Sequence, residues 1–504
     1  MLNGELVDSG AIGTFLRTPL TTLYLLILAG VCTYGLHRCW LTWVYFRYRH
    51  HVPRRRRRFA DLPIVSVQLP MYNEKLVAER IIEAACKIDY PTDKLQVQVL
   101  DDSTDESAEI ARRCVERMTR RGHDVVYIHR SHRQGYKAGA LSEGLKTARG
   151  ELIAIFDADF VPPANILKRT VHYFTDSNIG MVQTRWDHLN REDSLLTRSQ
   201  AIYLDGHFVI EHAARNRSGR WMNFNGTAGL WRRRAIESAG DWQHDTLTED
   251  LDLSYRAQLA HWKFVYLSAV RCPAELPPET NAFKSQQHRW AKGSIQTAIK
   301  MLPRILRSDA SISTKLEAFF HLTSPLVYLL VFVMTVITFP VIYLNLHPFG
   351  PRSASGLTFG LILFMLATVS AAVFYCASQC LCRRRLLTTL LQIPTLMAIG
   401  VGISLNNAVA VVEALVGHSS EFVRTPKYNA TGSGRLWRSN AQFVRLPNKW
   451  KLTIFELVMG CYLAVCIGLA VSIDPMSVSI PFLILFATGY FYVGFTSVAW
   501  ASHS

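Results

Sequence analysis

The sequence predicts an α/β domain with a mainly parallel sheet, joined to an α-helical transmembrane domain. Short apolar runs alternate with helical segments between residues 61 and 285, which is typical of parallel sheets covered by helices. Apolar segments long enough to cross a bilayer lie near the N-terminus and in the last third of the chain. The mean hydropathy of +0.11 is high for a soluble enzyme of 504 residues, and it agrees with this division.

The charge balance favours a membrane protein over a nucleic-acid-binding one. The chain has 55 Lys and Arg against 39 Asp and Glu, a net charge of +16. The basic residues lie largely beside apolar segments, as they do on the cytosolic flanks of membrane helices. We therefore expect a lipid bilayer, and no nucleic acid, among the partners. None of the ten cysteines belongs to a CxxC motif.

Residues 1–60 are expected to hold a retained transmembrane helix, near 20–46, and a basic juxtamembrane segment. Arg17 is the one basic residue before the apolar run, whereas Arg47, Arg49 and the arginines at 54–58 follow it. The positive-inside rule then places the next domain in the cytosol. We expect a multi-pass protein of the cell membrane, inner or plasma, with a cytosolic catalytic domain.

Residues 61–285 are expected to form that α/β domain, because apolar runs of strand length alternate with longer helical patterns. The first strands are predicted at 64–69, 96–100, 125–128 and 152–155, with helices at 74–87, 103–121 and 136–148 between them. Further strands are predicted near 181–185 and 263–267, with long helices near 193–214 and 249–260.

Residues 286–315 are expected to form an amphipathic helix at the membrane surface, and 316–504 a C-terminal transmembrane domain. Spans are predicted near 317–345, 357–381, 453–473 and 479–500. Segment 386–416 has basic residues on both sides, so we interpret it as re-entrant or interfacial. That leaves loop 418–450 on the catalytic side. If the segment spans instead, this loop lies outside.

Two aspartates at the end of one predicted strand are the main chemical signal. Asp157 and Asp159 follow the run at 152–155, and ligands of open α/β sheets bind at the carboxyl ends of strands. Such a pair can hold Mg²⁺ or Mn²⁺ against a diphosphate. An isolated Asp-x-Asp is more often a solvated turn. Here a second pair of carboxylates supports a binding site, because Asp101 and Asp102 end another predicted strand and face the same crevice.

Cations and a further carboxylate complete the predicted site. Lys137 opens a helix, where a phosphate is favoured, and Arg289 offsets the charge of a departing diphosphate. Asp250, at the start of another helix, is the candidate general base, although an acidic first turn is also a common helix cap. Trp290 offers an indole face to a sugar ring, and the loop at 224–229 contains glycines that let an acceptor approach the backbone.

These motifs together resemble those of processive family 2 glycosyltransferases, the cellulose synthase superfamily. The resemblance rests on segments that occur in the same order, namely 68–74, 99–105, 135–140, 156–160, 224–232, Thr248-Glu249-Asp250 and 286–290. It is closest to the cellulose synthase-like A and C branch, whose members make glucomannan and β-glucan backbones. Thr248 departs from that plant branch, which usually has valine there.

The resemblance implies a GT-A fold, an inverting mechanism and a channel beside the catalytic domain. It implies that Asp101, Asp102, Lys137, Asp157 and Arg289 bind the nucleotide sugar, with Asp157 and Asp159 at the metal and Asp250 as the base. It assigns the acceptor site to Gln286, Arg289, Trp290, Phe224, Asn225, Gly226 and Thr227. A gating loop would hold Phe422, Arg424, Thr425 and Lys427, although Arg424 and Pro426 depart from the cellulose-type motif.

The predicted function is polymerisation of a β-linked glycan and its translocation across the membrane. The donor is a nucleotide sugar, GDP-mannose or UDP-glucose, the product is β-1,4-mannan, glucomannan or β-glucan, and the growing polysaccharide is itself a partner. One alternative is a non-processive transferase to a lipid acceptor, which the extended motif at 286–290 disfavours. Another is a catalytically dead transporter or scaffold, which the complete set of carboxylates disfavours.

Overall fold

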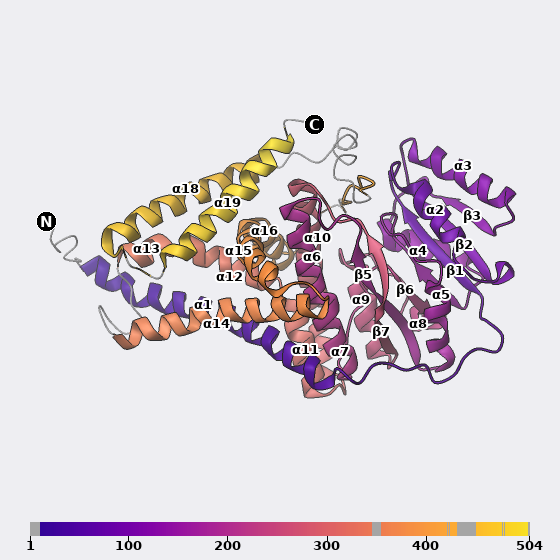
Figure 1. Ribbon diagram of the computed structural model, residues 1–504, viewed down its shortest axis with the longest axis horizontal. Helices are drawn as coiled ribbons and strands as arrows, with labels where there is room; N and C mark the ends of the chain where they lie inside the picture. The colour runs from indigo at the N-terminus through magenta and orange to yellow at the C-terminus, as the bar shows by residue number, and fades with distance from the viewer. Residues whose placement is uncertain are drawn as a thin grey trace. The chain divides into compact units, whose positions relative to one another are not determined.

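The computed structural model describes residues 11–344, 354–420, 422, 424–430, 450–475, 477 and 479–501. The chain divides into two compact units. The α/β unit comprises Leu41–Thr323, Glu413–Pro447 and His503–Ser504, and the helical unit comprises Met1–Trp40, Ser324–Val412 and Asn448–Ser502. Figure 1 gives the labels of their elements.

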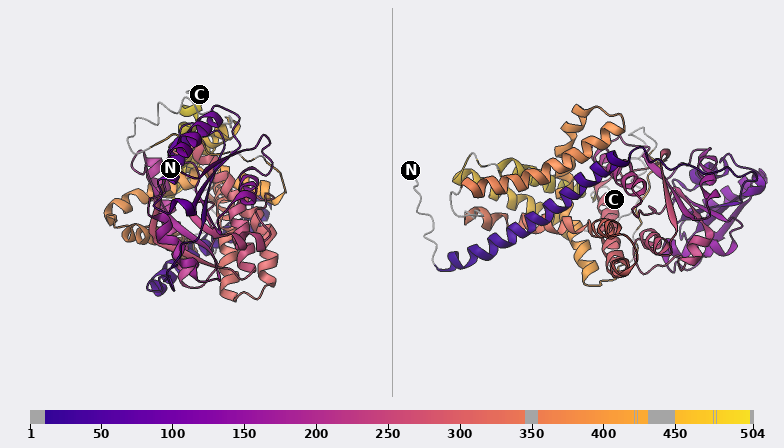
Figure 2. Two further views of the ribbon diagram at one scale, coloured as in Figure 1. Left: turned by 90° about the vertical axis from the view of Figure 1, so that its right-hand side faces the viewer. Right: turned by 90° about the horizontal axis from the view of Figure 1, so that it is seen from below.

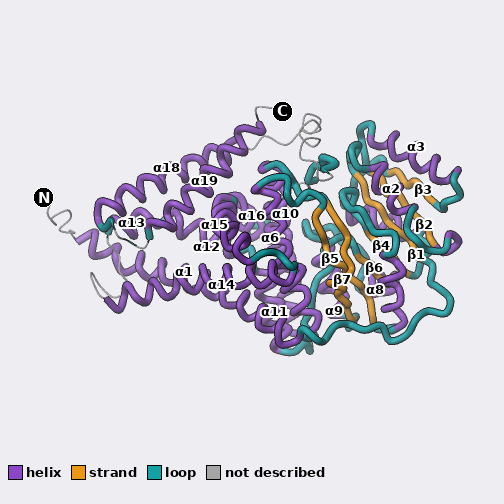
Figure 3. Tube along the Cα trace, in the orientation of Figure 1, coloured by secondary structure: helices purple, strands orange, loops and turns teal. Residues whose placement is uncertain are grey.

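The α/β unit is built on a seven-stranded sheet with the order β3-β2-β1-β4-β6-β5-β7. The pairs β1–β2, β1–β4, β2–β3 and β5–β7 are parallel, which confirms the predicted mainly parallel sheet. Figure 3 shows the strands together, with helices on the faces of the sheet. The strands are β1 Val65–Met71, β2 Leu95–Asp101, β3 Val125–His129, β4 Leu152–Ile155, β5 Ile179–His188, β6 Gly229–Arg232 and β7 Lys263–Ala274.

Strand β4 is apolar throughout because helices bury both faces of the sheet. Every residue of β4 is buried. Leu152 and Ala154 pack into the core on one face, and Ile153 and Ile155 pack into the core on the other. This two-residue alternation explains why four consecutive apolar residues form a strand here rather than a helix turn.

Strand β6 was not predicted, and it runs antiparallel to both of its neighbours, β4 and β5. Gly229 pairs with Ile155, the last residue of β4. The start of β6 therefore lies at the edge of the sheet where β1, β2 and β4 end. The loop at 224–228, which precedes β6, therefore lies at the same edge of the sheet as the residues that follow β4.

The helices of this unit follow the predicted pattern with shifted bounds. The first three are α2 Ala78–Cys86, α3 Ser107–Arg120 and α4 Tyr136–Thr147. Later come α5 Ile166–Thr170, α6 Leu195–Asp205, a π-helical segment Gly206–His212, α7 Ala213–Arg217, α8 Arg233–Ser238, α9 Glu249–Leu259, α10 Thr280–Arg307 and α11 Ile312–Thr323. Lys292 of α10 is fully buried and pairs with Glu413 at 2.8 Å.

The helical unit has three helices apolar and long enough to cross a membrane among the described residues, at Thr18–Tyr48, Trp450–Ile473 and Ile480–Ala499. Two bent pairs, Ile312–Thr323 with Leu326–Val336 (53°) and Leu386–Gly402 with Ser404–Leu415 (44°), raise the number to five if each is one span. The chain is thus a candidate multi-span membrane protein. The bend between the last two helices fits a broken span as well as a re-entrant segment.

Close packing of small residues joins the helices of this unit. They are α1 Ala11–Tyr48, α12 Leu326–Val336, α13 Thr338–Tyr343, α14 Ala354–Leu381, α15 Leu386–Gly402, α16 Ser404–Leu415, α18 Trp450–Ile473 and α19 Ile480–Ala501. Helices α18 and α19 lie side by side (Figures 1 and 2). A Cβ added at Gly489 would lie 2.1 Å from the Ala398 carbonyl oxygen, so α15 and α19 depend on glycine to approach each other.

Candidate active site

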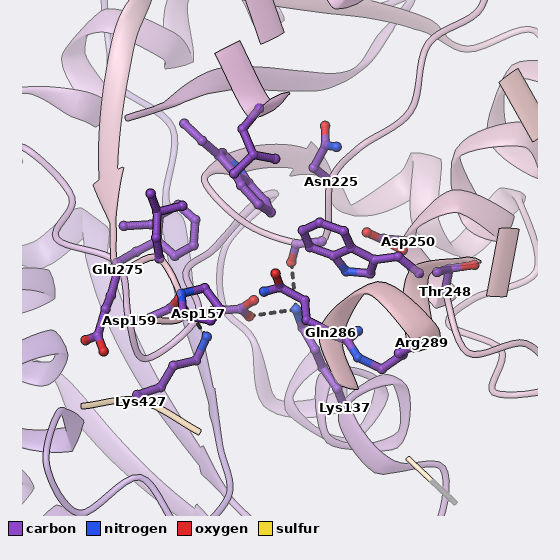
Figure 4. A pocket seen from close by; sticks show the side chains of 18 of the residues that line it. Lys137, Asp157, Asp159, Asn225, Thr248, Asp250, Glu275, Gln286, Arg289 and Lys427 are labelled. Carbon is purple, nitrogen blue, oxygen red and sulfur yellow. Dashed lines mark hydrogen bonds and ion pairs between the residues drawn. The ribbon is translucent and has the colours of Figure 1, made fainter. Parts of the chain in front are cut away.

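A cavity of about 110 Å³ opens in the α/β unit at the carboxyl ends of the parallel strands. It brings together Lys137, Asp157, Asp159, Asp250 and Arg289, which come from four separate places in the sequence (Figure 4). Gln286, Trp290, Gly226 and Asn225 also line it, together with Phe422 and Lys427. Most of the predicted site residues therefore share one cavity, as the strand-end rule leads one to expect.

Asp157 is held by a lysine and by the loop before β6. The Lys137 ammonium donates to Asp157 Oδ1 at 2.6 Å and to the Gly226 carbonyl at 2.9 Å. The Asp157 backbone N–H donates to the Thr227 hydroxyl at 2.8 Å. Burial lowers the pKa of Lys137, but the Asp157 and Glu249 carboxylates outweigh it and raise the pKa overall, so this lysine stays charged.

Asp159 has one oxygen paired and one free. The Lys427 ammonium donates to Asp159 Oδ2 at 2.7 Å, whereas the buried Oδ1 has no hydrogen-bond partner. A buried carboxylate oxygen left without a donor is costly, and a cation removes that cost. The donor set fits a divalent metal that prefers oxygen ligands. Among the described residues no third His, Cys, Asp or Glu joins a metal-binding group, so a ligand or water would supply the remaining donors.

Asp250 lies at the beginning of α9 and faces the same cavity. Its Oδ1 accepts a hydrogen bond from the Leu251 backbone N–H at 2.8 Å. Burial, and then the neighbouring Glu249 carboxylate, raise the pKa of Asp250 to about 7. A carboxylate with a pKa near neutrality is a stronger base than an ordinary one, which suits proton removal from a hydroxyl.

Gly226 brings the backbone against this carboxylate. Its φ is +81°, a left-handed conformation that favours glycine. A Cβ at this position would lie 2.9 Å from Asp250 Oδ2, so a side chain would press on this carboxylate. The glycine is needed both for the turn and for the space.

Gln286, Arg289 and Trp290 come from α10 and line the cavity together. Burial lowers the pKa of Arg289, although the nearby carboxylates of Glu249, Asp250, Asp157 and Asp159 oppose that effect. The Arg289 Nε is buried without a hydrogen-bond partner. An unpaired guanidinium N–H beside two aspartates is placed to bind an anion such as a diphosphate.

Asp101 and Asp102 differ from the other aspartates because protein groups occupy their oxygens. Asp101 accepts from the Tyr127 hydroxyl at 2.7 Å and the Ser103 backbone N–H at 3.1 Å. Asp102 is held by Arg130 through two contacts of 2.7 and 2.5 Å. Asp102 lines a second cavity that adjoins the first, and Asp101 lines neither.

The structure divides the predicted acceptor loop into lining and supporting residues. Phe224 is fully buried and packs edge-on against Trp231, and Thr227 is buried beneath Asp157. The Asn225 side-chain amide lies 3.0 Å from His207 Nε2 in the π-helical segment. Only Asn225 and Gly226 of the four line the cavity.

The segment at 424–430 covers the second cavity, which Phe422, Arg424, Thr425 and Lys427 all line. Arg424 pairs with Glu74 at 2.7 Å. Glu275 accepts the backbone N–H groups of Tyr428 at 2.6 Å and Ala430 at 3.1 Å. The rest of the predicted loop 418–450 lies partly outside the described residues, namely 421, 423 and 431–449.

The sequence analysis missed Glu275, whose two oxygens anchor this segment. Burial raises the pKa of Glu275 to about 7, although the Tyr428 N–H and Lys427 lower it. The sequence feature that could have identified Glu275 is its position directly after strand β7, because Asp157 was identified from the same kind of position after β4. No paired carboxylate accompanied it, so no motif drew notice to it.

Comparisons with known proteins agree with this geometry. The family described as "Glycosyltransferase like family 2" matches residues 63–293. Glucomannan 4-beta-mannosyltransferase 7 of Arabidopsis thaliana is 34% identical over 460 residues, which cover 86% of this chain and 77% of that relative. Glucomannan 4-beta-mannosyltransferase 1 of Oryza sativa subsp. japonica is 45% identical over 251 residues, about half of each chain.

A solved structure supports the fold. A mannosyltransferase from Pyrobaculum calidifontis, in complex with GDP-Man and Mn²⁺, superposes with a TM-score of 0.52 at 18% identity. The match covers 79% of this chain and 100% of that one. Together these comparisons confirm the resemblance and the GT-A fold that the motifs predicted.

Proposed function

The chain belongs to the family 2 glycosyltransferases, and from that premise we propose that it polymerises a β-1,4-linked mannan or glucomannan backbone. GDP-mannose is the proposed donor, supported by the mannosyltransferase names of its relatives. One observation carries the proposal above the others. A carboxylate with a pKa near 7 shares one cavity with the cations Lys137, Arg289 and Lys427.

The donor diphosphate is proposed to lie against those cations. Lys137, Arg289 and Lys427 surround the Asp157–Asp159 segment, so negative charge is favoured beside them once a metal balances the aspartates. Asp157 and Asp159 are the residues that would hold Mg²⁺ or Mn²⁺, on the strength of the unpaired Asp159 Oδ1. Such an ion, when bound, stabilises the charge that develops on the leaving diphosphate.

Asp250 is proposed as the general base. It removes the proton from the acceptor hydroxyl as that oxygen forms a bond to the anomeric carbon of the donor sugar. The bond from that carbon to the diphosphate breaks at the same time, and the nucleoside diphosphate leaves. Attack from the face opposite the leaving group inverts an α-linked donor into a β-linked product.

The acceptor end of the glycan is proposed to lie against Gln286, Trp290 and the loop around Gly226. An indole face stacks on the apolar face of a sugar ring, which suits repeated binding of a polymer end. We propose that residues 61–285 catalyse transfer on the cytosolic side of the cell membrane. The helix at 286–315 would contact the bilayer, and 316–504, with its loop at 418–450, would pass the product through it.

Donor preference and polymerisation can be tested on purified, detergent-solubilised protein. GDP-mannose, UDP-glucose and UDP-N-acetylglucosamine are each supplied with Mn²⁺ or Mg²⁺, and products are digested with β-mannanase and β-glucanase. We expect a β-mannanase-sensitive polymer from GDP-mannose. Single-sugar transfer to lipid, or turnover with UDP-sugars alone, would overturn the proposal.

The role of the base is tested in the same assay. Asp250→Asn removes the proton acceptor, and general-base loss is expected to lower kcat by about 10²- to 10⁴-fold. Asp245→Asn, at an exposed position five residues earlier, is the matched control and is expected to keep near-normal turnover. Near-full activity of Asp250→Asn in folded protein would exclude this assignment.

A further inference from the structure

The second cavity shows where a nucleobase would lie, if the proposed function holds. Both cavities share the three cations assigned to the diphosphate, Lys137, Arg289 and Lys427. They also share Asp157, Asp159 and Phe422. Asp250 and Trp290 line only the first cavity, so the sugar and acceptor belong there. The nucleoside must extend the other way, toward Tyr72, Asp102 and Arg133, which line only the second cavity.

Most polar groups in the second cavity already have protein partners. Asp102 is bound by Arg130, and Glu74 is bound by Arg424 at 2.7 Å. Lys137 is committed to Asp157, and Lys427 to Asp159. These groups fix the shape and charge of the cavity and leave few donors for a base, among them the buried Thr425 hydroxyl, which has no hydrogen-bond partner.

Arg133 is different, because its neighbours are aromatic rings. Its guanidinium carbon lies 3.4 Å from the centre of the Tyr72 ring, 5.0 Å from that of Tyr136 and 5.9 Å from that of Phe422. Its Nε is buried without a hydrogen-bond partner. Among the residues that the structure describes, no carboxylate forms an ion pair with it. A partly buried cation in this state is suited to a ligand that brings an acceptor.

We propose that Arg133 reads the nucleobase of the donor and selects guanine. The N–H groups of a guanidinium lie in its plane, so stacking on Tyr72 fixes the plane and leaves the N–H edge available. Guanine offers two adjacent acceptors, O6 and N7, which match that edge with two parallel hydrogen bonds. Adenine replaces O6 with an amino donor, and uracil has no N7, so each loses at least one bond.

The sharpest test uses nucleotides that differ in these acceptors. Binding of GDP, IDP, 7-deaza-GDP, UDP and ADP is measured on the full-length protein in detergent. IDP keeps O6 and N7 and should bind nearly as well as GDP. The 7-deaza analogue lacks N7 and should bind several-fold more weakly. Loss of the bidentate pair in ADP or UDP is expected to cost about 5- to 150-fold in affinity.

Replacement of the arginine should abolish these differences. Arg133→Gln is expected to weaken GDP binding to about the level of ADP, and to make GDP and 7-deaza-GDP bind equally. Its affinity for inorganic pyrophosphate should not change, because the diphosphate residues are untouched. His132→Gln, at the exposed neighbouring position, is the matched control and should keep the preference for GDP.

The outcomes separate this inference from the proposed function. If GDP-mannose is turned over but the wild-type protein binds GDP and 7-deaza-GDP equally, the base-reading role is wrong and the function stands. The same holds if Arg133→Gln weakens GDP, UDP and pyrophosphate alike. If no nucleotide binds to folded wild-type protein, the proposed function fails first. The wild-type analogue series remains decisive even if Arg133→Gln does not fold.

Discussion

The two aspartate pairs occupy equivalent places in the fold but differ in their partners. Asp101 and Asp102 end β2, and Asp157 and Asp159 follow β4, so both pairs reach the same edge of the sheet. Tyr127, Ser103 and Arg130 occupy the oxygens of the first pair. The second pair has lysines from distant segments, and Asp159 Oδ1 has no partner.

From this contrast we infer that a position at a strand end is not enough to define a binding carboxylate. Where protein donors already fill the oxygens, the carboxylate stabilises the edge and shapes the cavity. Where one oxygen stays unpaired and the other partners are lysine ammonium groups, the carboxylate can take up a cation. Hydrogen-bond saturation therefore separates a supporting residue from a binding one.

The largest expected effect comes from neutralising one member of each pair. Asp159→Asn removes a proposed metal ligand and is expected to lower kcat by about 10³-fold. Asp102→Asn breaks a charged pair with Arg130 and is expected to lower the free energy of unfolding by about 2 kcal/mol. Turnover assays and thermal unfolding of both variants measure the two effects.

A different result for Asp102→Asn would contradict this distinction between the two aspartate pairs. A catalytic loss at Asp102 as large as that at Asp159, in protein of unchanged stability, would mean that both pairs bind ligand directly. Asp124→Asn, at a half-buried position where the carboxylate pairs with Arg149, controls for the loss of a carboxylate outside both cavities and should change neither quantity by much.

Asp250, which lies outside the two aspartate pairs, can be distinguished from them by the pH dependence of the reaction. Asp250 must be deprotonated to act as a base, and its pKa is raised to about 7 by burial and by Glu249. Below pH 7 the protonated form dominates, so kcat/KM is expected to fall about 10-fold per pH unit and to level off above pH 7. Initial rates between pH 5 and 9 measure this.

Glu249→Gln gives a directional check on that profile. It removes the neighbouring negative charge that helps raise the pKa of Asp250, so the acid limb should move to lower pH. A profile that stays flat down to pH 5, or a limb that does not move in this variant, would contradict the assignment.

The smallest expected effect concerns the cation on Asp159. Lys427→Met removes the ammonium that donates to Asp159 Oδ2. A divalent metal then no longer competes with it, so Mn²⁺ should bind in the absence of nucleotide with an affinity about 3- to 10-fold higher. Lys168→Met, a surface control that pairs with Asp89, should leave Mn²⁺ binding unchanged. An unchanged affinity in Lys427→Met would mean that the Lys427–Asp159 pair does not form in solution.

Much of the fold followed from local patterns. The parallel strands were predicted because each is a short apolar run followed by a helix, and Asp157 stood out because it ends such a run. Strand β6 was not predicted because its four residues follow a glycine-containing loop, and nothing in the local sequence indicates that they pair antiparallel with β4. Strand direction is decided by long-range pairing, which the local sequence does not encode.

The carboxylates and the cations Lys137, Arg289 and Lys427 were predicted from the sequence, whereas Glu275 and Arg133 were not. Asp250 and Arg289 were identified by motif, and the structure places them in one cavity with Asp157. Arg133 was missed because a single arginine in a basic chain carries no signal until Tyr72 is seen 3.4 Å away. A contact across 61 positions depends on the register of β1 against β2 and on the turn before α4, and no short window contains both.

The pairing of Asp159 with Lys427 also limits when the site can form during protein synthesis. The two residues are 268 positions apart in the chain. Ribosomes add about 5 to 20 residues per second, so roughly 15 to 50 seconds separate their synthesis. During that interval several apolar helices must enter the bilayer while Asp159 waits without its lysine. In a nascent chain that stops before residue 427, Asp159 therefore lacks the lysine that balances its charge. Synthesis must pass residue 427 before the site can be complete.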